Sequence, residues 1–273
     1  MLKKIIIFLL IIISLCVLFL IKISYFSSSK KINFDKLNFI AHAGGGYKNV
    51  IYSNSMESVL KSIKDGFKFI ELDILSTEDN YLVAAHDWKN FKKNCFNHQN
   101  YIDSKPLNYE KFNNCDYKKN SINFTQLNED QIKKIFLSDK SLYLVTDKIR
   151  DYKILSKKFS FVERIIPETF SVKDYIFAKY YGFQNPIFPF KKYNFLIGRI
   201  LNIKLINISY TDFIKYEKEV HGLFNKGINI YVYTSNDENF IKKNIKQKIS
   251  GVYTDFWDIN LNKCLSKSGC LSY

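Results

Sequence analysis

The sequence predicts an α/β protein whose parallel strands form a (β/α)8 TIM barrel, preceded by an N-terminal transmembrane helix. Short apolar runs typical of strands alternate with segments of helical periodicity along most of the chain. Roughly eight such strands fit a barrel, a fold of about 250 residues. The alternative is a doubly wound sheet, which normally carries a glycine fingerprint that is absent from this sequence.

The elements follow one another in a regular order. We expect strands at residues 37–42, 67–75, 81–86, 141–146, 161–166, 186–190, 204–209, 228–234 and 251–254. Helical periodicity predicts helices at residues 54–65, 128–137, 150–158, 171–181, 212–225 and 237–246. Several of the helices end at a glycine, as Gly66 and Gly182 illustrate.

Residues 88–124 interrupt this alternation. They are rich in Asn, Lys and Tyr and show no period, so we expect an inserted loop or small subdomain. Four cysteines lie beyond the N-terminal region and permit two disulfides in an exported domain. Three pairings are possible. Sequence proximity favours Cys95–Cys115 and Cys264–Cys270.

The N-terminus has the pattern of a membrane anchor. Lys3 and Lys4 precede an apolar stretch from Ile5 to Ile21, which Lys22 closes. The basic flank comes first, which predicts that the N-terminus is cytoplasmic and the barrel lies on the extracytoplasmic side. No small-residue cleavage signature follows. We therefore expect an uncleaved anchor at residues 1–24, a tether at 25–36 and the barrel at 37–273.

The net charge of +15, from 41 Lys and Arg against 26 Asp and Glu, favours anionic partners. Phosphate groups and acidic lipid head groups are the partners that we expect. Nucleic acid is disfavoured because the lysines are scattered and no nucleic-acid motif is present. A general compositional bias toward Lys, Asn and Ile is the alternative explanation of the charge.

Two histidines and two acids stand at or near strand ends. Glu71 and Asp73 are separated by one residue, so both side chains point to the same face of their strand. Two close carboxylates repel each other, and oxygen ligands favour Ca²⁺ or Mg²⁺ as the neutralising cation. Pairing with Lys or Arg is the alternative. His42 and His86 flank this acid pair in sequence and are candidates for general acid and general base.

These residues lie within longer motifs that carry a resemblance. The segments are His42-Ala43-Gly44-Gly45, Ser53-Asn54-Ser55-Met56-Glu57, Gly66-Phe67-Lys68-Phe69-Ile70-Glu71-Leu72-Asp73, Thr77-Glu78-Asp79, Leu82-Val83, His86-Asp87, residues 143–148, residues 231–237 and residues 251–255. In order and spacing the sequence resembles the glycerophosphodiester phosphodiesterase family, of the phospholipase-C-like phosphodiesterase superfamily, over about residues 37–258.

The resemblance implies a TIM barrel with an insertion after its second strand. It implies a divalent cation, Ca²⁺ or Mg²⁺, on Glu71, Asp73 and Asp147, with His42 and His86 as the acid–base pair. The implied reaction begins with attack on phosphorus by a neighbouring substrate hydroxyl and ends with hydrolysis to an alcohol and sn-glycerol 3-phosphate. The matching segments also supply candidate substrate-binding residues, namely Asn54, Lys148, Glu168 and Tyr233.

The sequence departs from the family pattern at three positions. Ala43 stands where the family has an arginine that grips phosphate, so the sequence resembles a divergent member of the family. Lys48 or Lys148 could replace that arginine. Lys148 directly follows Asp147, whereas the family spaces its acid and lysine by one residue, and Asp147 replaces a more usual Glu. Glu168 could complete the metal ligands, or it could simply begin a helix.

Two other functions are compatible with these residues. One is a lipid-directed phospholipase of the same superfamily, of the phosphoinositide or sphingolipid type, held beside its substrate by the anchor. The other is a non-catalytic barrel that binds phosphoryl ligands. The retained histidines and acids favour an enzyme, whereas Ala43 favours a binding protein.

Overall fold

The computed structural model describes residues 5–11, 14, 18, 32, 38–96, 103–266 and 269–273. Within them, a nine-stranded sheet has the order β7-β6-β2-β1-β11-β10-β9-β8, with β3 pairing to β2 outside this path. All neighbours on the path are parallel. The strands are β1 (Phe39–Ala41), β2 (Phe69–Ser76), β3 (Leu82–Ala84), β6 (Tyr143–Asp147), β7 (Ile165–Pro167), β8 (Phe188–Pro189), β9 (Leu205–Ser209), β10 (Asn229–Tyr233) and β11 (Gly251–Thr254).

The two end strands of this path also meet. A parallel bridge joins Glu168, just after β7, to Ile187, just before β8. Thr169 and Ile187 extend the contact, because the Thr169 amide donates to the Ile187 carbonyl and the Ile187 amide donates to the Pro167 carbonyl, both at 2.9 Å. The parallel strands therefore form a closed TIM-barrel-like fold, as the sequence predicted.

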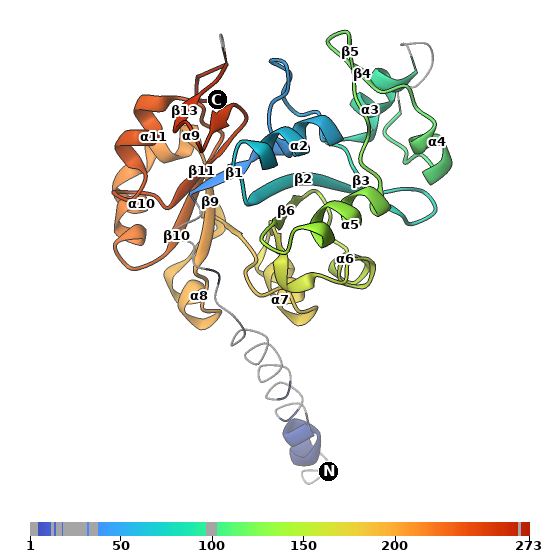
Figure 1. Cartoon of the computed structure of the whole chain (residues 1–273). Coiled ribbons are helices and arrows are strands. Elements are labelled where there is room, and N and C mark those ends of the chain that lie inside the picture. The colour runs from blue at the N-terminus through green and yellow to red at the C-terminus, as the bar shows by residue number, and fades with distance from the viewer. Residues whose placement is uncertain are drawn as a thin grey trace.

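Helices surround the strands (Figure 1). They are α2 (Met56–Lys64), α5 (Glu129–Ser138), α6 (Tyr152–Lys158), α7 (Val172–Tyr180), α8 (Phe195–Ile200), α9 (Tyr210–Lys215), α10 (Glu217–Phe224) and α11 (Glu238–Asn244). Ile70, Leu72 and Ile74 of β2 belong to the core between strands and helices. The alternate residues of β2 point into the barrel, which agrees with the period of two expected for this strand.

The insertion forms a small subdomain beside the barrel (Figure 1). It comprises α3 (Trp88–Cys95), α4 (Tyr109–Asn113) and the antiparallel hairpin of β4 (Lys118–Lys119) and β5 (Ile122–Asn123). The rings of Phe91 and Phe112 stack at its centre, with their centroids 4.7 Å apart. The Cys95–Cys115 disulfide ties α3 to the segment before the hairpin, and Cys264–Cys270 closes a second loop near the C-terminus. Both pairings are those that sequence proximity favoured.

Four local expectations need correction. The run at 81–86 yields β3, which is antiparallel to β2 and is not one of the parallel barrel strands. Residues 162–164 form a 3-10 helix, so β7 begins only at Ile165. The helix expected at 212–225 divides into α9 and α10 near Tyr216. The short helix α8 was not anticipated, because its six residues are too few to establish a period.

Most of the predicted anchor and tether, residues 1–36, lies outside the described residues. Among the residues that are described, no helix is both long enough and apolar enough to cross a membrane.

Candidate active site

Polar side chains form a layer at the carboxyl ends of the barrel strands. The barrel interior below them is filled by apolar and aromatic side chains, namely Ile40, Phe69, Val145, Ile166, Ile187, Leu205, Tyr231 and Tyr253. One strand pleat further on stand His42, Glu71, Asp147, Glu168, Asn207 and Tyr233. The period of two thus places an apolar floor beneath a polar cavity, at the barrel end where active sites are built.

This cavity has a volume of about 310 Å³. Eight of the nine predicted site residues line it, namely His42, Glu71, Asp73, His86, Asp147, Lys148, Glu168 and Tyr233. The ninth, Asn54, is buried behind Asp73. Its side-chain amide donates to Asp73 Oδ2 at 2.8 Å, and its side-chain oxygen accepts from the Asp73 backbone amide at 3.0 Å. Asn54 therefore fixes the orientation of Asp73.

Glu71 and Asp73 are both almost fully buried on β2, so their mutual repulsion is poorly screened. Glu71 Oε2 accepts a hydrogen bond from the Ala43 amide at 2.6 Å. Burial raises the pKa of Glu71 well above its usual range, and the nearby carboxylates of Asp73, Glu168 and Asp147 raise it further. This group of acids requires a compensating positive charge.

Lys148 supplies one positive charge to the acid cluster. Its backbone is in the left-handed region, with φ of 64°. Its Nζ lies 2.6 Å from Asp147 Oδ2 and 3.5 Å from Asp73 Oδ1. Burial lowers the pKa of Lys148, but the carboxylates of Asp147 and Asp73 outweigh this and raise it overall. Lys148 therefore reaches the cavity although it directly follows Asp147.

Glu168 directly follows β7, which is two strands away from β2 in the order of the sheet. Its Oε1 accepts from the Tyr253 hydroxyl at 2.6 Å, and its Oε2 accepts from the Asn207 side chain. Burial raises the pKa of Glu168 to about 8, and the charge of Asp147 contributes in the same direction. Tyr253 and Asn207 were not identified from the sequence, although each lies at an inward-facing position of its strand.

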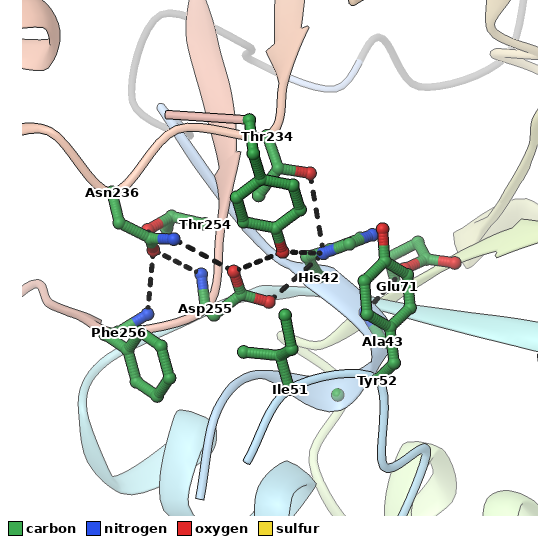
Figure 2. A network of polar contacts seen from close by, with 12 residues as sticks. His42, Ala43, Ile51, Tyr52, Glu71, Thr234, Asn236, Thr254, Asp255 and Phe256 are labelled. Atoms are coloured by element: carbon green, nitrogen blue, oxygen red, sulfur yellow. Dashed lines mark hydrogen bonds and ion pairs between the residues drawn. The ribbon is translucent and has the colours of Figure 1, made fainter. Parts of the chain in front are cut away.

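His42 follows β1 and is held by a buried polar network (Figure 2). Its Nδ1 lies 3.1 Å from Asp255 Oδ1, and Asp255 is fully buried. The other Asp255 oxygen accepts from the Asn236 side-chain amide at 2.9 Å and from the Tyr273 hydroxyl at 2.8 Å. Asn236 is fixed in turn, because its side-chain oxygen accepts from the Asp255 backbone amide at 2.7 Å. His42 thus has a rigid, anionic partner.

Sequence reasoning missed Asp255 as a site residue. The structure brings it to His42 because β11 pairs with β1, with Thr254 opposite Ala41. The available signal was the acid directly after the last predicted strand, Gly251 to Thr254. A closed barrel places its last strand beside its first, so the predicted fold already indicated that this acid lies near His42.

His86 has a different environment. It follows β3, its side chain is 43% exposed, and its Nδ1 lies 2.9 Å from Asp87 Oδ2. Asp87 also begins α3, since its carboxylate accepts from the Asn90 amide. The ring of Tyr52 stands between the two histidines, with its centroid 4.5 Å from that of His42 and 5.4 Å from that of His86. Both imidazoles therefore border the same cavity.

The donor chemistry of the site suits a hard divalent cation. Glu71, Asp73 and Asp147 offer only carboxylate oxygens, which Ca²⁺ and Mg²⁺ prefer. A bound cation would also relieve the repulsion that raises the pKa of Glu71. In the part of the chain that the structure describes, no three His, Cys, Asp or Glu side chains converge closely enough to hold one metal ion.

Fold and site together define a TIM-barrel protein with two histidines and an acid cluster at the carboxyl ends of its strands. The sequence model of the glycerophosphoryl diester phosphodiesterase family matches residues 42–180, half of the chain. The chain belongs to this family of phosphoric diester hydrolases. The matched region contains both histidines and all four acids of the cavity. No curated protein sequence matches the chain significantly.

Solved structures share the fold at low sequence identity. A glycerophosphodiester phosphodiesterase from Thermotoga maritima is 19% identical, with a TM-score of 0.59 over 80% of this chain and 94% of that one. One from Parabacteroides distasonis is 17% identical, with a TM-score of 0.60 over 80% and 92%. A phosphodiesterase from Oleispira antarctica, in complex with the product sn-glycerol-3-phosphate, is 15% identical, with a TM-score of 0.61 over 80% and 92%.

Proposed function

We propose that this protein hydrolyses a glycerophosphodiester to an alcohol and sn-glycerol 3-phosphate. The observation that carries the proposal is the meeting of His42, His86 and four carboxylates in one cavity at the carboxyl ends of the strands. Family membership and a relative that holds sn-glycerol-3-phosphate as its product support the same reaction.

In the proposed first step, the hydroxyl next to the phosphate-bearing carbon of glycerol attacks phosphorus. A new P–O bond forms, the bond to the leaving alcohol breaks, and a cyclic phosphate results. One histidine takes the proton of the attacking hydroxyl, and the other gives a proton to the leaving oxygen. Water then opens the cyclic phosphate, with the two proton transfers reversed, so that both histidines return to their initial states.

The environments of the two histidines favour an assignment of roles. Asp255 stabilises positive charge on the His42 ring, so we assign His42 as the base that takes the first proton. His86 is half-exposed and lies at the edge of the cavity, where an outgoing alcohol can leave, so we assign it as the acid. The Asp87 contact orients the His86 ring for this role.

Phosphate charge has two sources of compensation in this proposal. Lys148 lines the cavity and offers an ammonium where the family arginine is replaced by the small, buried Ala43. Lys48 is exposed and does not line the cavity, so Lys148 is the better replacement. When bound to Glu71, Asp73 and Asp147, Ca²⁺ or Mg²⁺ would supply Lewis-acid stabilisation of the charge on phosphorus-bound oxygens.

The test uses the full chain, purified in detergent and stripped of metal with EDTA. We expect it to release glycerol 3-phosphate from glycerophosphoglycerol or glycerophosphocholine after Ca²⁺ or Mg²⁺ is restored, and expect the variant Glu71→Gln to be inactive. A cyclic phosphate as the final product, from lipid substrates, would favour a lipid-directed phospholipase instead. Tight binding of glycerol phosphate with no turnover of any diester would overturn the proposal in favour of a binding protein.

We also propose that the barrel works on the extracytoplasmic side of a membrane, held there by residues 1–24. Two disulfides, Cys95–Cys115 and Cys264–Cys270, support an oxidising compartment. The basic flank before the apolar stretch supports the orientation. Trapping free thiols in intact cells tests this. We expect a membrane-bound protein in which the four disulfide cysteines are blocked, whereas alkylation of these four cysteines would contradict the proposal.

A further inference from the structure

A second cavity, of about 510 Å³, continues from the first. The two cavities share Tyr52 and His86. The rest of the second cavity is lined by the insertion and the segments that flank it, including Lys93 of α3 and Lys119 of β4. In the proposed reaction the leaving group departs from phosphorus in the first cavity and takes a proton from His86. The second cavity adjoins the first at His86, so it is the space that the leaving group would enter.

The charged side chains that line this second cavity have a positive sum. Among the described residues, no carboxylate lies within ion-pair distance of Lys93 or Lys119. The one acid that lines the cavity is Asp87, which is held by its own hydrogen bonds. Its oxygens accept from the Asn90 backbone amide, from the Asn90 side chain and from His86. The lining of the second cavity thus carries two ammonium groups against one carboxylate, so its net charge is positive.

Lys119 is held in place from within the protein. Its Nζ donates to the carbonyls of Ile51 and Tyr52, at 2.9 and 3.0 Å. The same Nζ lies 5.9 Å from the centroid of the Tyr52 ring. The protein's own ammonium therefore already lies over one face of that ring.

A hydrogen-bond donor completes the second cavity. Tyr117 lines it and is only 5% exposed, yet its hydroxyl has no hydrogen-bond partner among the described residues. Its ring stacks on Phe91 at 5.1 Å and so does not form an open aromatic cage. Such a group is suited to a ligand oxygen.

From these observations we infer that the second cavity binds the leaving alcohol of the diester, and that it selects an alcohol carrying an anionic group over one carrying a quaternary ammonium. This inference rests on the proposed phosphodiester hydrolysis. The two lysines and the Tyr117 hydroxyl contact the anionic group, and His86 protonates the alcohol oxygen at the junction of the cavities.

Three diesters that share the glycerol phosphate half test the inference. Their leaving alcohols are glycerol phosphate, glycerol and choline, which are anionic, neutral and cationic. We expect the kcat/KM of the full chain to fall in that order, with at least a tenfold difference between the first and the last, and expect the difference to shrink as salt is added. Equal values, or a preference for choline, would overturn the inference.

Matched charge variants locate the effect. Lys93→Glu is expected to lower kcat/KM about fivefold for the anionic alcohol and to leave the choline diester unchanged or improved. Lys89→Glu, on the same helix but outside the cavity, is expected to change neither. A second pair of variants lies on β4, with Lys119→Met as the test and Lys118→Met as its control. Lys118 serves as the control because it is ion-paired with Asp116 and does not line the cavity.

The outcomes separate the two proposals. If none of the three diesters is hydrolysed, the proposed function fails. If all are hydrolysed but Lys93→Glu and Lys89→Glu behave alike on the anionic and cationic substrates, only the inference about the second cavity fails.

Discussion

His42 and His86 border one cavity but are supported by different parts of the protein. His42 follows a barrel strand, its side chain is 13% exposed, and its partner Asp255 is fully buried. His86 opens the insertion, its side chain is 43% exposed, and its partner Asp87 is 35% exposed. The barrel therefore fixes one half of the site through buried hydrogen bonds, whereas the insertion presents the other half to solvent and to the leaving group.

The largest expected effect tests this division of roles. We expect His42→Ala to lower kcat at least about 10³-fold for every diester, because it removes the group that is assigned to take the proton of the attacking hydroxyl. We expect His86→Ala to cause a similar loss with glycerophosphoglycerol but less than a tenfold loss with a p-nitrophenyl diester of glycerol phosphate. The nitrophenolate leaves without a proton, so it does not need the acid.

Steady-state kinetics on the two substrates provides the measurement. His221→Ala, on α10 and outside the cavity, is the control for a lost histidine. Equal rescue of both variants by the nitrophenyl substrate would mean that the histidine roles are not divided in this way.

Stability provides the next contrast, because the barrel half contains buried acids. The pKa of Glu168 rises from 4.5 to about 8 on folding, so the folded state holds its proton more tightly than the unfolded state. Its contribution to stability is full below about pH 4.5 and is lost as the pH rises through about 8. We expect the metal-free protein to lose up to a few kcal/mol over this range from Glu168.

Denaturant unfolding in EDTA at several pH values measures this loss. Glu168→Gln should flatten the profile, whereas Asp87→Asn in the exposed half should leave its slope unchanged. The hypothesis is wrong if Glu168→Gln retains the full dependence on pH.

The partners of the two histidines give a smaller contrast. We expect Asp255→Asn to lower kcat about tenfold to a hundredfold, because a buried amide cannot stabilise a charged His42 ring. Asp87→Asn should lower kcat less than about threefold, because solvent screens that pair. Adding Asp255→Asn to His42→Ala should cause no loss of kcat beyond that of His42→Ala alone. A further loss would place Asp255 in a separate role.

The sequence predicted the strands and acids of the barrel half better than the contacts between them. Glu71 and Asp73 were found because their spacing along one strand determines their common face. The His42–Asp255 contact joins residues from the two ends of the barrel, β1 and β11. Barrel closure implied that these strands are neighbours, but the acid after the last strand was not assigned to the site. The run at 81–86 resembled a barrel strand, since hydrophobicity does not reveal whether a strand pairs in parallel.

The insertion half was the least predictable. Its composition gave no period, so neither α3 nor the hairpin that carries Lys119 could be anticipated from residues 88–124. The presence of an insertion and its disulfide pairing could be anticipated, the latter because proximity along the chain limits which cysteines meet. Lys148 shows that local backbone conformation is also hard to predict within the barrel. Its backbone is left-handed and its side chain contacts Asp147, and neither feature is visible in the sequence.

The smallest expected effect concerns Tyr273, which touches the barrel half from the end of the chain. Its backbone pairs with Thr234, and its hydroxyl donates to Asp255 Oδ2 at 2.8 Å. Tyr273→Phe removes this donor, but the Asn236 amide still occupies the same oxygen, so Asp255 stays oriented. We therefore expect only a two- to fivefold decrease in kcat, about what one hydrogen bond to a charged group contributes when a second one remains. The kcat of Tyr273→Phe should be measured beside that of Asp255→Asn. If both variants lose the same amount of activity, Tyr273 rather than Asn236 holds the carboxylate against His42. The rigidity of the barrel half would then depend on the loop closed by Cys264–Cys270, and reduction of that disulfide should lower kcat to the same extent.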